Sequence, residues 1–277
     1  MYIIKKQNEL QTYLQDRDSI GFVPTMGALH AGHIRLVEKS KTESSLTVCS
    51  IFVNPRQFNN QNDFDKYPVT IEKDLELLLK ASCDVLFLPS VAEMYPEGSL
   101  QVYEYDLGYL DLILEGTHRP GHFNGVCTIV HKLLKAVMPH RLYLGEKDYQ
   151  QCMVIKRLLQ ITAMPVDLVI CPTLRASDGL AMSSRNARLS VAARSKASMI
   201  FQCLEYIQKN QQRASFPDLQ AECLNKLSAH GFETEYLSLA DADKLELLND
   251  FDFDKPMVVL IAAVLEDVRL IDNMRIC

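Results

Sequence analysis

The stretch GFVPTMGALHAGH, residues 21–33, decides the fold of this chain. Its first residues belong to an apolar run over residues 20–23 that has the length of a buried strand, and we expect Pro24 to end that strand. Residues 25–27 then form a turn. The apolar spacing that begins at Ile34 predicts a helix directly after this stretch. A strand, a turn and a helix in this order form the first part of a βαβ unit.

Two histidines, His30 and His33, stand where this helix should begin. At a spacing of three, both rings lie on one face of the first turn, beside backbone N–H groups that have no partner inside the helix. A helix N-terminus with two imidazole donors suits an anion, phosphate above all, and Gly32 leaves room for the ligand to approach. The spacing also suits surface residues or a pair of zinc ligands, although the other histidines supply no matching pair.

The composition is that of a globular protein with a large apolar core. Of the 277 residues, 48% are hydrophobic and 23% are charged. At roughly 100–200 residues per domain, the chain can form one large domain or two of ordinary size. The net charge of −6 and the pI near 5.7 argue against a broad nucleic-acid surface. A small basic pocket for phosphates stays possible, because it depends on local charge.

The cysteines and the apolar segments indicate the compartment. The eight cysteines contain no C-x-x-C pair, and most lie inside apolar runs, which is typical of buried and reduced thiols. The N-terminus, MYIIKKQNEL, lacks the apolar core and cleavage site of a signal peptide. No apolar run reaches the roughly 18 residues of a transmembrane helix. We therefore expect a cytoplasmic protein without a membrane segment.

Strand patterns and helix patterns alternate along the first two thirds of the chain. Further strands are expected over residues 46–53, 84–88, 141–144 and 166–170, and helices over residues 8–14, 69–81, 126–137 and 149–161. This alternation predicts an α/β fold, a Rossmann-like parallel sheet built from βαβ units. Ligands bind such sheets at the carboxyl ends of the strands. Three polar motifs follow strands here: TMGALHAGH, NPRQF and GEKD.

The character of the sequence changes after Cys171. Residues 173–190, TLRASDGLAMSSRNARLS, are rich in small and polar side chains and read as a mobile loop or linker. Helices over residues 190–210 and 219–229 and short strands over 234–239, 258–263 and 268–271 follow. We expect a first domain over residues 1–173 and a smaller C-terminal α+β domain over residues 174–277.

The phosphate chemistry must use a device other than the common glycine-rich loops, because neither G-x-x-x-x-G-K-[ST] nor G-x-G-x-x-G occurs. GEKD supplies Gly145 for close approach, Lys147 as a point charge and Asp148 as a contact to metal or ribose. A single EKD is otherwise a solvated charge cluster. Its place after a strand favours a functional Lys147.

The segment MSSRN offers a second set of phosphate ligands. Ser183 and Ser184 can donate to phosphate oxygens, and Arg185 can bind them with two parallel hydrogen bonds. A helix cap followed by a surface arginine is the alternative interpretation. Gln57 and Gln151 could fix a hydroxy acid, or they are ordinary polar residues.

The RPGHF segment, residues 119–123, forms a turn before a helix. For His122 within it, the sequence favours a structural role over a catalytic one.

Seven segments occur along the chain in an order that is characteristic of one protein family: VPTMGALHAGH, SIFVNPRQF, FDKYP, RPGHF, LGEKDYQQ, DGLAMSSRN and RLIDNM. Together they resemble the pantothenate synthetase (pantoate–β-alanine ligase) family of the nucleotidyltransferase superfamily, which is marked by H-x-G-H. The resemblance runs through most of the first domain and the linker and weakens beyond about Leu189. The chain departs from the family pattern at residues 176–177 and 266–267.

The resemblance implies a two-step reaction. D-Pantoate attacks the α-phosphate of ATP to give pantoyl adenylate and pyrophosphate, and β-alanine then displaces AMP to give pantothenate. It also implies a Rossmann-like nucleotide- and pantoate-binding first domain, a C-terminal lid domain, Mg²⁺ that accompanies ATP, and a homodimer. Another H-x-G-H nucleotidyltransferase that keeps an adenylylated product, or a catalytically silent nucleotide-binding relative, is the alternative.

The resemblance also implies roles for the residues of this chain that match the family motifs by position. The resemblance implies that His30, His33, Lys147 and Arg185 are catalytic, with His33 as proton donor. Gln57 and Gln151 match the pair that binds pantoate and β-alanine, and Asp74 matches a magnesium-associated acid. The implied ATP contacts are Met26, Gly27, Ala28, Leu29, His30, Ala31, Gly32, His33, Gly145, Glu146, Lys147, Asp148, Leu174, Met182, Ser183, Ser184 and Arg185.

Overall fold

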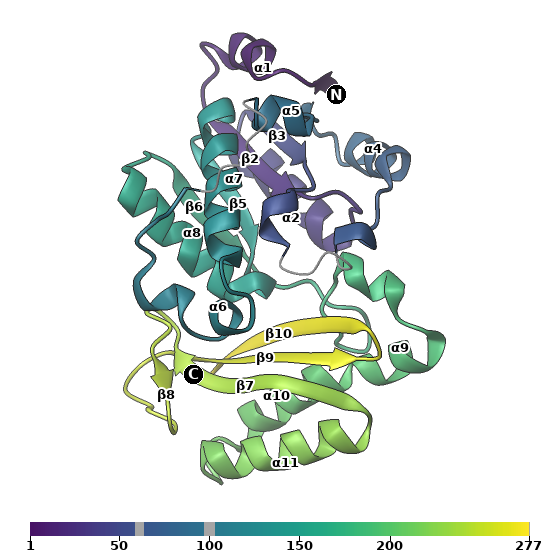
Figure 1. Cartoon of the computed structure of the whole chain (residues 1–277), viewed down its shortest axis with the longest axis vertical. Coiled ribbons are helices and arrows are strands. Elements are labelled where there is room, and N and C mark those ends of the chain that lie inside the picture. The colour runs from purple at the N-terminus through teal and green to yellow at the C-terminus, as the bar shows by residue number, and fades with distance from the viewer. Residues whose placement is uncertain (59–63, 97–102, 277) are drawn as a thin grey trace. The chain divides into compact units, whose positions relative to one another are not determined.

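The computed structural model describes residues 1–58, 64–96 and 103–276 and divides into two units (Figure 1). Unit 1 comprises Met1–Glu146 and Gln151–Pro172, and unit 2 comprises Lys147–Gln150 and Thr173–Cys277. The division after Pro172 lies one residue from the expected one. The assignment of Lys147–Gln150 to unit 2 was not expected from the sequence.

Unit 1 is built around a six-stranded sheet in which all strands run parallel. Across the sheet the strands are β1 (Tyr2–Ile4), β4 (Val85–Phe87), β3 (Leu46–Ile51), β2 (Ile20–Thr25), β5 (Arg141–Gly145) and β6 (Asp167–Cys171). The chain moves outward from β2 through β3 to β4 and then returns to place β5 on the other side of β2. The strand order therefore reverses between β2 and β5, and the predicted Rossmann-like parallel sheet is confirmed.

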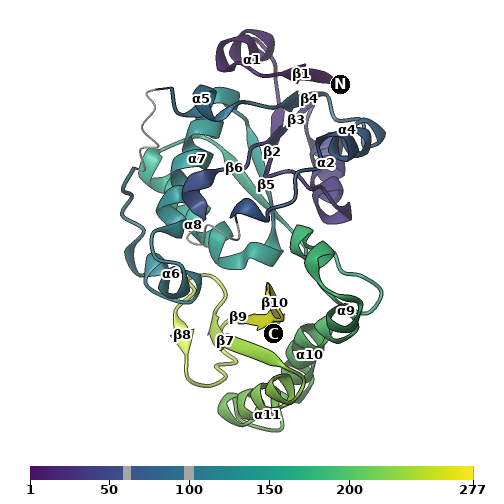
Figure 2. The ribbon, with the colours of Figure 1, turned by 45° about the vertical axis from the view of Figure 1, so that its right-hand side comes forward.

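Helices lie on both faces of this sheet (Figure 2). The helices α2 (Ala31–Glu43) and α4 (Ile71–Lys80) lie on one face, and α1 (Gln7–Leu14), α7 (His122–Val137) and α8 (Tyr149–Thr162) on the other. The shorter helices are α5 (Val91–Met94), α6 (Glu115–His118) and the 3₁₀ turns η1 (Pro55–Gln57), η2 (Gly108–Asp111) and η3 (Glu146–Asp148). Two covered faces explain why every residue of β3 is buried.

The expectation that Pro24 ends its strand was wrong. β2 continues through Pro24 to Thr25, which pairs with Ile51 of β3. The carbonyl of Thr25 accepts from Phe52 on the β3 side, so the backbone of Pro24 faces the β5 side. Pairing of β2 with β5 ends at Phe22, so no ladder bond needs the N–H that proline lacks.

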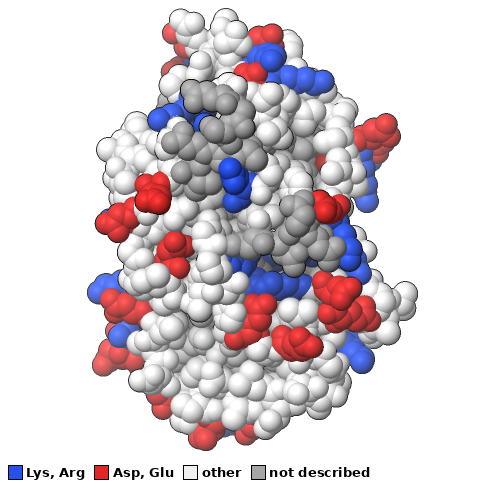
Figure 3. Space-filling view, in the orientation of Figure 1, with Lys and Arg blue, Asp and Glu red and all other residues white. Residues whose placement is uncertain are grey.

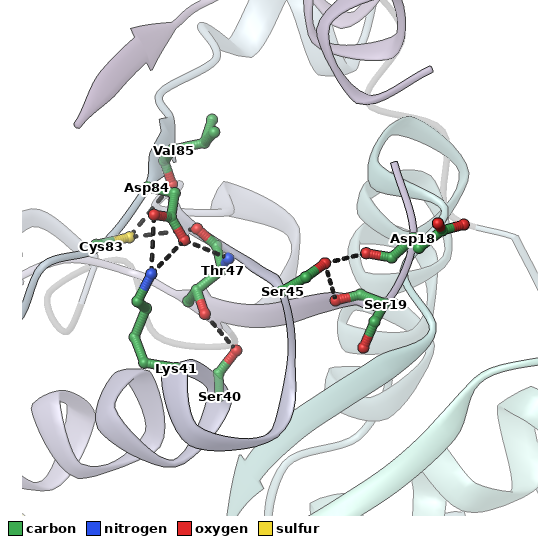
Figure 4. Close-up of polar contacts among 9 residues, drawn as sticks. All are labelled: Asp18, Ser19, Ser40, Lys41, Ser45, Thr47, Cys83, Asp84 and Val85. Carbon is green, nitrogen blue, oxygen red and sulfur yellow. Dashed lines mark hydrogen bonds and ion pairs between the residues drawn. The ribbon is translucent and has the colours of Figure 1, made fainter. Parts of the chain in front are cut away.

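A polar network ties the amino ends of β3 and β4 to the last turn of α2 (Figure 4). Both carboxylate oxygens of Asp84 lie 2.8 Å from Nζ of Lys41, and one accepts the backbone N–H of Thr47 at 2.7 Å. The hydroxyl of Ser40 lies 2.8 Å from that of Thr47. These bonds fix the sheet at the end opposite to its carboxyl edge.

Unit 2 is a four-stranded antiparallel sheet with helices packed on it (Figure 1). The strand order is β10 (Val268–Ile276), β9 (Met257–Leu265), β7 (Phe232–Asp241) and β8 (Leu247–Leu248), and the helices are α9 (Val191–Ala197), α10 (Met199–Asn210) and α11 (Phe216–Ala229), with the 3₁₀ turn η4 (Ser184–Arg188) before them. The core lies between the sheet and the helices α10 and α11. The expected smaller α+β domain is confirmed, but the helix expected over residues 190–210 is divided into α9 and α10.

The surface carries charges of both signs. On the face drawn in Figure 3, acidic and basic side chains lie interspersed among the residues that are coloured or white. None of the helices in the described ranges is long and apolar enough to cross a membrane. The seven cysteines that are described are buried and unbridged, as predicted, and Cys277 lies outside the described residues.

Candidate active site

The two histidines of the opening motif cap their own helix. His30 is the residue before α2, and its Nδ1 accepts the backbone N–H of Gly32 at 3.1 Å. Nδ1 of His33 accepts the backbone N–H of His30 at 3.3 Å, and the two ring centroids lie 4.0 Å apart. Because Nδ1 accepts in both rings, a neutral imidazole carries its proton on Nε2. The helix N-terminus therefore presents two imidazole N–H donors, which suits an anion.

A buried carboxylate holds the turn before these histidines. Asp74, in the first turn of α4, is fully buried and accepts the backbone N–H groups of Ala28 at 2.9 Å and Leu29 at 2.8 Å. The hydroxyl of Thr70 donates to the same carboxylate at 3.0 Å. Gly27 has a φ of +81°, and a Cβ on it would lie 3.1 Å from Asp74 Oδ2, so the turn requires glycine.

These hydrogen bonds show a structural role of Asp74 that the sequence analysis did not expect. Each carboxylate oxygen accepts a backbone N–H, which gives Asp74 a structural role in the turn, and its association with magnesium stays a prediction. In the ranges that the structure describes, no group of three or more His, Cys, Asp or Glu side chains is arranged to hold a metal ion. Asp74 shapes the turn that presents the histidines.

Gln57 lies beside the opening motif. It is the last residue of η1, the first element after β3, and its side-chain Nε2 donates to the sulfur of Met26 at 2.8 Å. Its Oε1 lies 3.3 Å from Nδ2 of Asn54. A carboxamide has two N–H donors and two acceptor positions, so these contacts leave one donor and one acceptor position of Gln57 for a ligand.

Asn54 supports the turn that carries Gln57, and the sequence analysis gave it no role. Its amide is fully buried and donates to Gly125 O at 3.2 Å, while its Oδ1 accepts the hydroxyl of Tyr95 at 2.9 Å. Burial raises the pKa of Tyr95 to about 12, so this hydroxyl stays a donor at neutral pH. The signal in the sequence was an asparagine between a buried strand and a proline.

The second glutamine follows the neighbouring strand. Gln151 lies in the first turn of α8, after β5 and η3, and is half-buried. Its amide has no hydrogen-bond partner within the described ranges, in contrast to that of Gln57. Gly145 ends β5, and its carbonyl accepts the thiol of Cys152 at 3.4 Å. β5 neighbours β2, so both motifs follow carboxyl ends at the point where the strand order reverses.

Lys147 is fixed through its backbone and belongs to unit 2. The side-chain amide of Asn273 on β10 donates to the carbonyl of Lys147 at 2.8 Å. The ammonium of Lys147 lies 3.4 Å from a carboxylate oxygen of its neighbour Asp148, which is half-exposed, so this pair is weak. Glu146, the residue before Lys147, begins the 3₁₀ turn η3.

Residues 174–182 form a short hairpin that is anchored to β10. The backbone N–H of Met182 donates to the carbonyl of Leu174 at 2.9 Å. Arg175 makes two parallel hydrogen bonds to the buried Asp272, at 2.5 and 3.0 Å. Gly179 has a φ of +90°, and a Cβ there would overlap a side-chain ring in this unit. This part of the expected mobile loop or linker over residues 173–190 therefore forms a hairpin with hydrogen bonds to β10.

The MSSRN segment is a capped 3₁₀ turn. Ser183 precedes η4, and its hydroxyl accepts the backbone N–H of Arg185 at 3.3 Å. This bond is the helix cap that the sequence left open as an alternative. It does not exclude a ligand, because a hydroxyl also donates. Ser184 and Arg185 lie within the same turn, so Leu174, Met182 and these three residues are neighbours in unit 2.

The site residues thus fall into two groups. In unit 1, hydrogen bonds link the opening motif to Gln57 through Met26 and to α4 through Asp74. In unit 2, Lys147 and the hairpin both attach to β10, through Asn273 and Asp272.

Comparisons with known proteins cover both groups. A family model described as pantoate-beta-alanine ligase matches residues 2–275. A pantothenate synthetase of Cytophaga hutchinsonii is 46% identical over 259 residues, which are 92% of this chain and 91% of that protein. Another, from Bacteroides fragilis, is 42% identical over 270 residues, 97% of this chain and 95% of that protein.

Solved structures are similar over the same length. The crystal structure of pantothenate synthetase from Thermus thermophilus has a TM-score of 0.92 and 40% sequence identity and covers 99% of both chains. A pantoate-beta-alanine ligase from Francisella tularensis, in complex with beta-gamma ATP and beta-alanine, has a TM-score of 0.84 and 38% identity. That match covers 99% of this chain and 97% of the other.

Proposed function

Because the chain belongs to the pantoate–β-alanine ligase family, we propose that it condenses D-pantoate with β-alanine at the expense of ATP. The products are pantothenate, AMP and pyrophosphate. The observation that carries this assignment is the joint geometry of the histidine cap and Gln57. Donors for phosphate and an amide for a hydroxy acid lie on loops after β2 and β3, and Met26 connects them.

The first step forms pantoyl adenylate. A carboxylate oxygen of pantoate attacks the α-phosphorus of ATP, and the bond to the bridging oxygen of pyrophosphate breaks. The substrate supplies the nucleophile, so the protein has to align the reactants and offset charge on the phosphates. We assign alignment of pantoate to Gln57 and Gln151, and charge stabilisation to the Nε2–H groups of His30 and His33.

In the proposed first step, residues of unit 2 supply the positively charged side chains. Lys147 and Arg185 would offset the charge of the departing pyrophosphate, and the hydroxyls of Ser183 and Ser184 would donate to phosphate oxygens. We assign Leu174 and Met182 to the adenosine part of ATP. This unit would also act as the lid over the adenylate, which water would otherwise hydrolyse.

The second step consumes the adenylate. The neutral amine of β-alanine attacks the acyl carbon, the bond to AMP breaks, and the nitrogen loses a proton. Mg²⁺ would enter as the counter-ion of ATP and reduce the negative charge of its phosphates. Asp74 supports the turn before the histidines through its bonds to Ala28 and Leu29, and a contact between this carboxylate and Mg²⁺ stays a prediction.

Two further assignments accompany the function. Buried, unbridged cysteines suit a reducing compartment, so we propose that the enzyme works in the cytoplasm. We propose a homodimer as its assembly. Sedimentation equilibrium tests the assembly directly, because a mass of one chain at micromolar concentration would contradict it.

ATP–pyrophosphate exchange tests the proposed reaction. Labelled pyrophosphate is supplied with ATP and Mg²⁺, with and without D-pantoate, while β-alanine is withheld. Exchange that depends on pantoate is the expected result and requires a reversible acyl-adenylate step. A folded protein that binds ATP without exchange would instead be a transferase for another acceptor or a silent relative.

A further inference from the structure

The RPGHF motif has no part in the proposed reaction, yet it lies directly against the turn that carries Gln57. The motif leads into α7, and α7 packs on η1. Gly125, in the first turn of α7, permits this approach. A Cβ on Gly125 would lie 2.3 Å from the carbonyl oxygen of Arg56, so a larger residue would push the helix away from the turn.

Two donors from this motif converge on one atom. Nδ1 of His122 lies 2.7 Å from the backbone oxygen of Gln57, and a guanidinium nitrogen of Arg119 lies 3.3 Å from the same oxygen. A carbonyl oxygen can only accept, so Nδ1 of His122 carries a proton. His122 is only 6% exposed, and Arg119 is paired with the buried carboxylate of Glu115 at 3.6 Å. The donors are therefore held in place.

We propose that His122, supported by Arg119, is a positioning residue for the hydroxy-acid substrate. It fixes the main chain at Gln57, so that the side-chain amide, already held by Asn54 and Met26, meets the substrate without further ordering. His122 touches the protein backbone and is not a catalytic residue. The inference rests on the proposed function, because it takes Gln57 as a pantoate ligand.

The geometry predicts which kinetic constant changes. Loss of the bond to Gln57 lets the amide move, and substrate binding must then order it. The histidine cap is held separately by Asp74, so the ATP site keeps its shape. The KM of D-pantoate should therefore rise while the KM of ATP stays near its original value.

Three substitutions of His122 distinguish the effect of its hydrogen bond to Gln57 from the effect of its packing. His122→Asn places an amide N–H close to the position of Nδ1 and can donate to Gln57 O. His122→Gln places its amide farther out, and His122→Phe keeps the ring without a donor. We expect the KM of D-pantoate to rise about tenfold, or ~1.4 kcal/mol, in the Phe and Gln variants. The Asn variant should lie within about threefold of the original enzyme, and calorimetric titration with pantoate should give the same ranking.

A histidine on the same helix serves as the matched control. Nδ1 of His131 lies 2.8 Å from the hydroxyl of Tyr105, so His131→Phe removes a comparable bond that does not involve Gln57. Its KM for D-pantoate should be unchanged. If His122→Phe does not fold, Arg119→Gln removes the second donor and should raise the same constant by a smaller factor.

The outcomes distinguish this inference from the proposed function. No pantoate-dependent exchange by the unaltered enzyme would overturn the function. With exchange intact, an unchanged KM for D-pantoate in folded His122→Phe or Arg119→Gln would overturn the positioning role alone. Equal loss in the Asn, Gln and Phe variants would also overturn it, because packing would then matter and the donor would not.

Discussion

Nδ1 of His33 lies 3.3 Å from the backbone nitrogen of His30, so one histidine of the pair caps the helix at the other. The cap occupies one nitrogen of His33 and directs its proton to the other. Protonation of both nitrogens would remove the acceptor and break the cap. The neutral ring with its proton on Nε2 is therefore the form that can keep the cap and donate a hydrogen bond to a ligand at the same time.

The substitution His33→Asn separates the role of His33 as a helix cap from its proposed role as a donor to phosphate. The asparagine oxygen can accept the His30 N–H and keep the cap, but the variant lacks the Nε2–H donor. We expect pantoate-dependent exchange to fall about 10²–10³-fold, the usual effect of losing one such donor, while the midpoint of thermal unfolding stays close to the original. His33→Ala loses the cap as well, at roughly 1 kcal/mol of stability. Unchanged exchange in folded His33→Asn would remove His33 from the mechanism.

Asp74→Asn tests whether this residue shapes the turn or holds magnesium. The amide can accept only one of the two N–H bonds from Ala28 and Leu29, which leaves a buried donor unsatisfied at about 1–3 kcal/mol. We expect a lower free energy of unfolding in urea and slower exchange. The Mg²⁺ concentration for half-maximal activity should not change. An increase of that concentration would instead support a role of Asp74 in binding magnesium.

The sequence predicted the parallel sheet and its polar edge because local signals determine both. The spacing of apolar residues predicts β3 and α2. Once the strands are located, the polar motifs that come directly after them are placed at the carboxyl edge of the sheet. The role of Asp74 could not be predicted in this way, because its partners lie 45 and 46 residues earlier. The prediction that Pro24 ends its strand failed for a related reason, because it depended on a neighbouring strand far away in the sequence. β5 no longer pairs with β2 at Pro24, and a strand tolerates proline at such a position.

Lys147 offers a clean test of charge, because its hydrogen bond to Asn273 uses only its backbone oxygen. Lys147→Met removes the ammonium and retains that bond and much of the apolar stem. We expect exchange to fall by at least about 100-fold, with thermal unfolding and the far-ultraviolet spectrum unchanged. Asn273→Ala is the comparison variant, since it frees the backbone but keeps the charge, and it should lose less activity. A fully active Lys147→Met protein would contradict the charge assignment.

The pair of Arg175 and Asp272 supports the hairpin over residues 174–182, and it makes the stability of unit 2 dependent on pH. Arg175→Met leaves the buried carboxylate of Asp272 without its cation, at a cost of roughly 3–5 kcal/mol near neutral pH. Burial raises the pKa of Asp272, and Arg175 opposes that rise.

The raised pKa of Asp272 determines how the stability of Arg175→Met changes with pH. Without Arg175 the folded protein holds a proton on Asp272 that the unfolded chain releases near its ordinary pKa, about 3.9. The contribution of Asp272 to the variant's stability is therefore fully present below that value and is lost as pH rises through the raised folded pKa. Urea unfolding of Arg175→Met from pH 4 to 8 measures this. Adding Asp272→Asn removes the titrating group, so the double variant should be less dependent on pH and more stable than Arg175→Met at pH 8. A single variant as stable as the original at pH 8 would show that the hairpin does not need the pair.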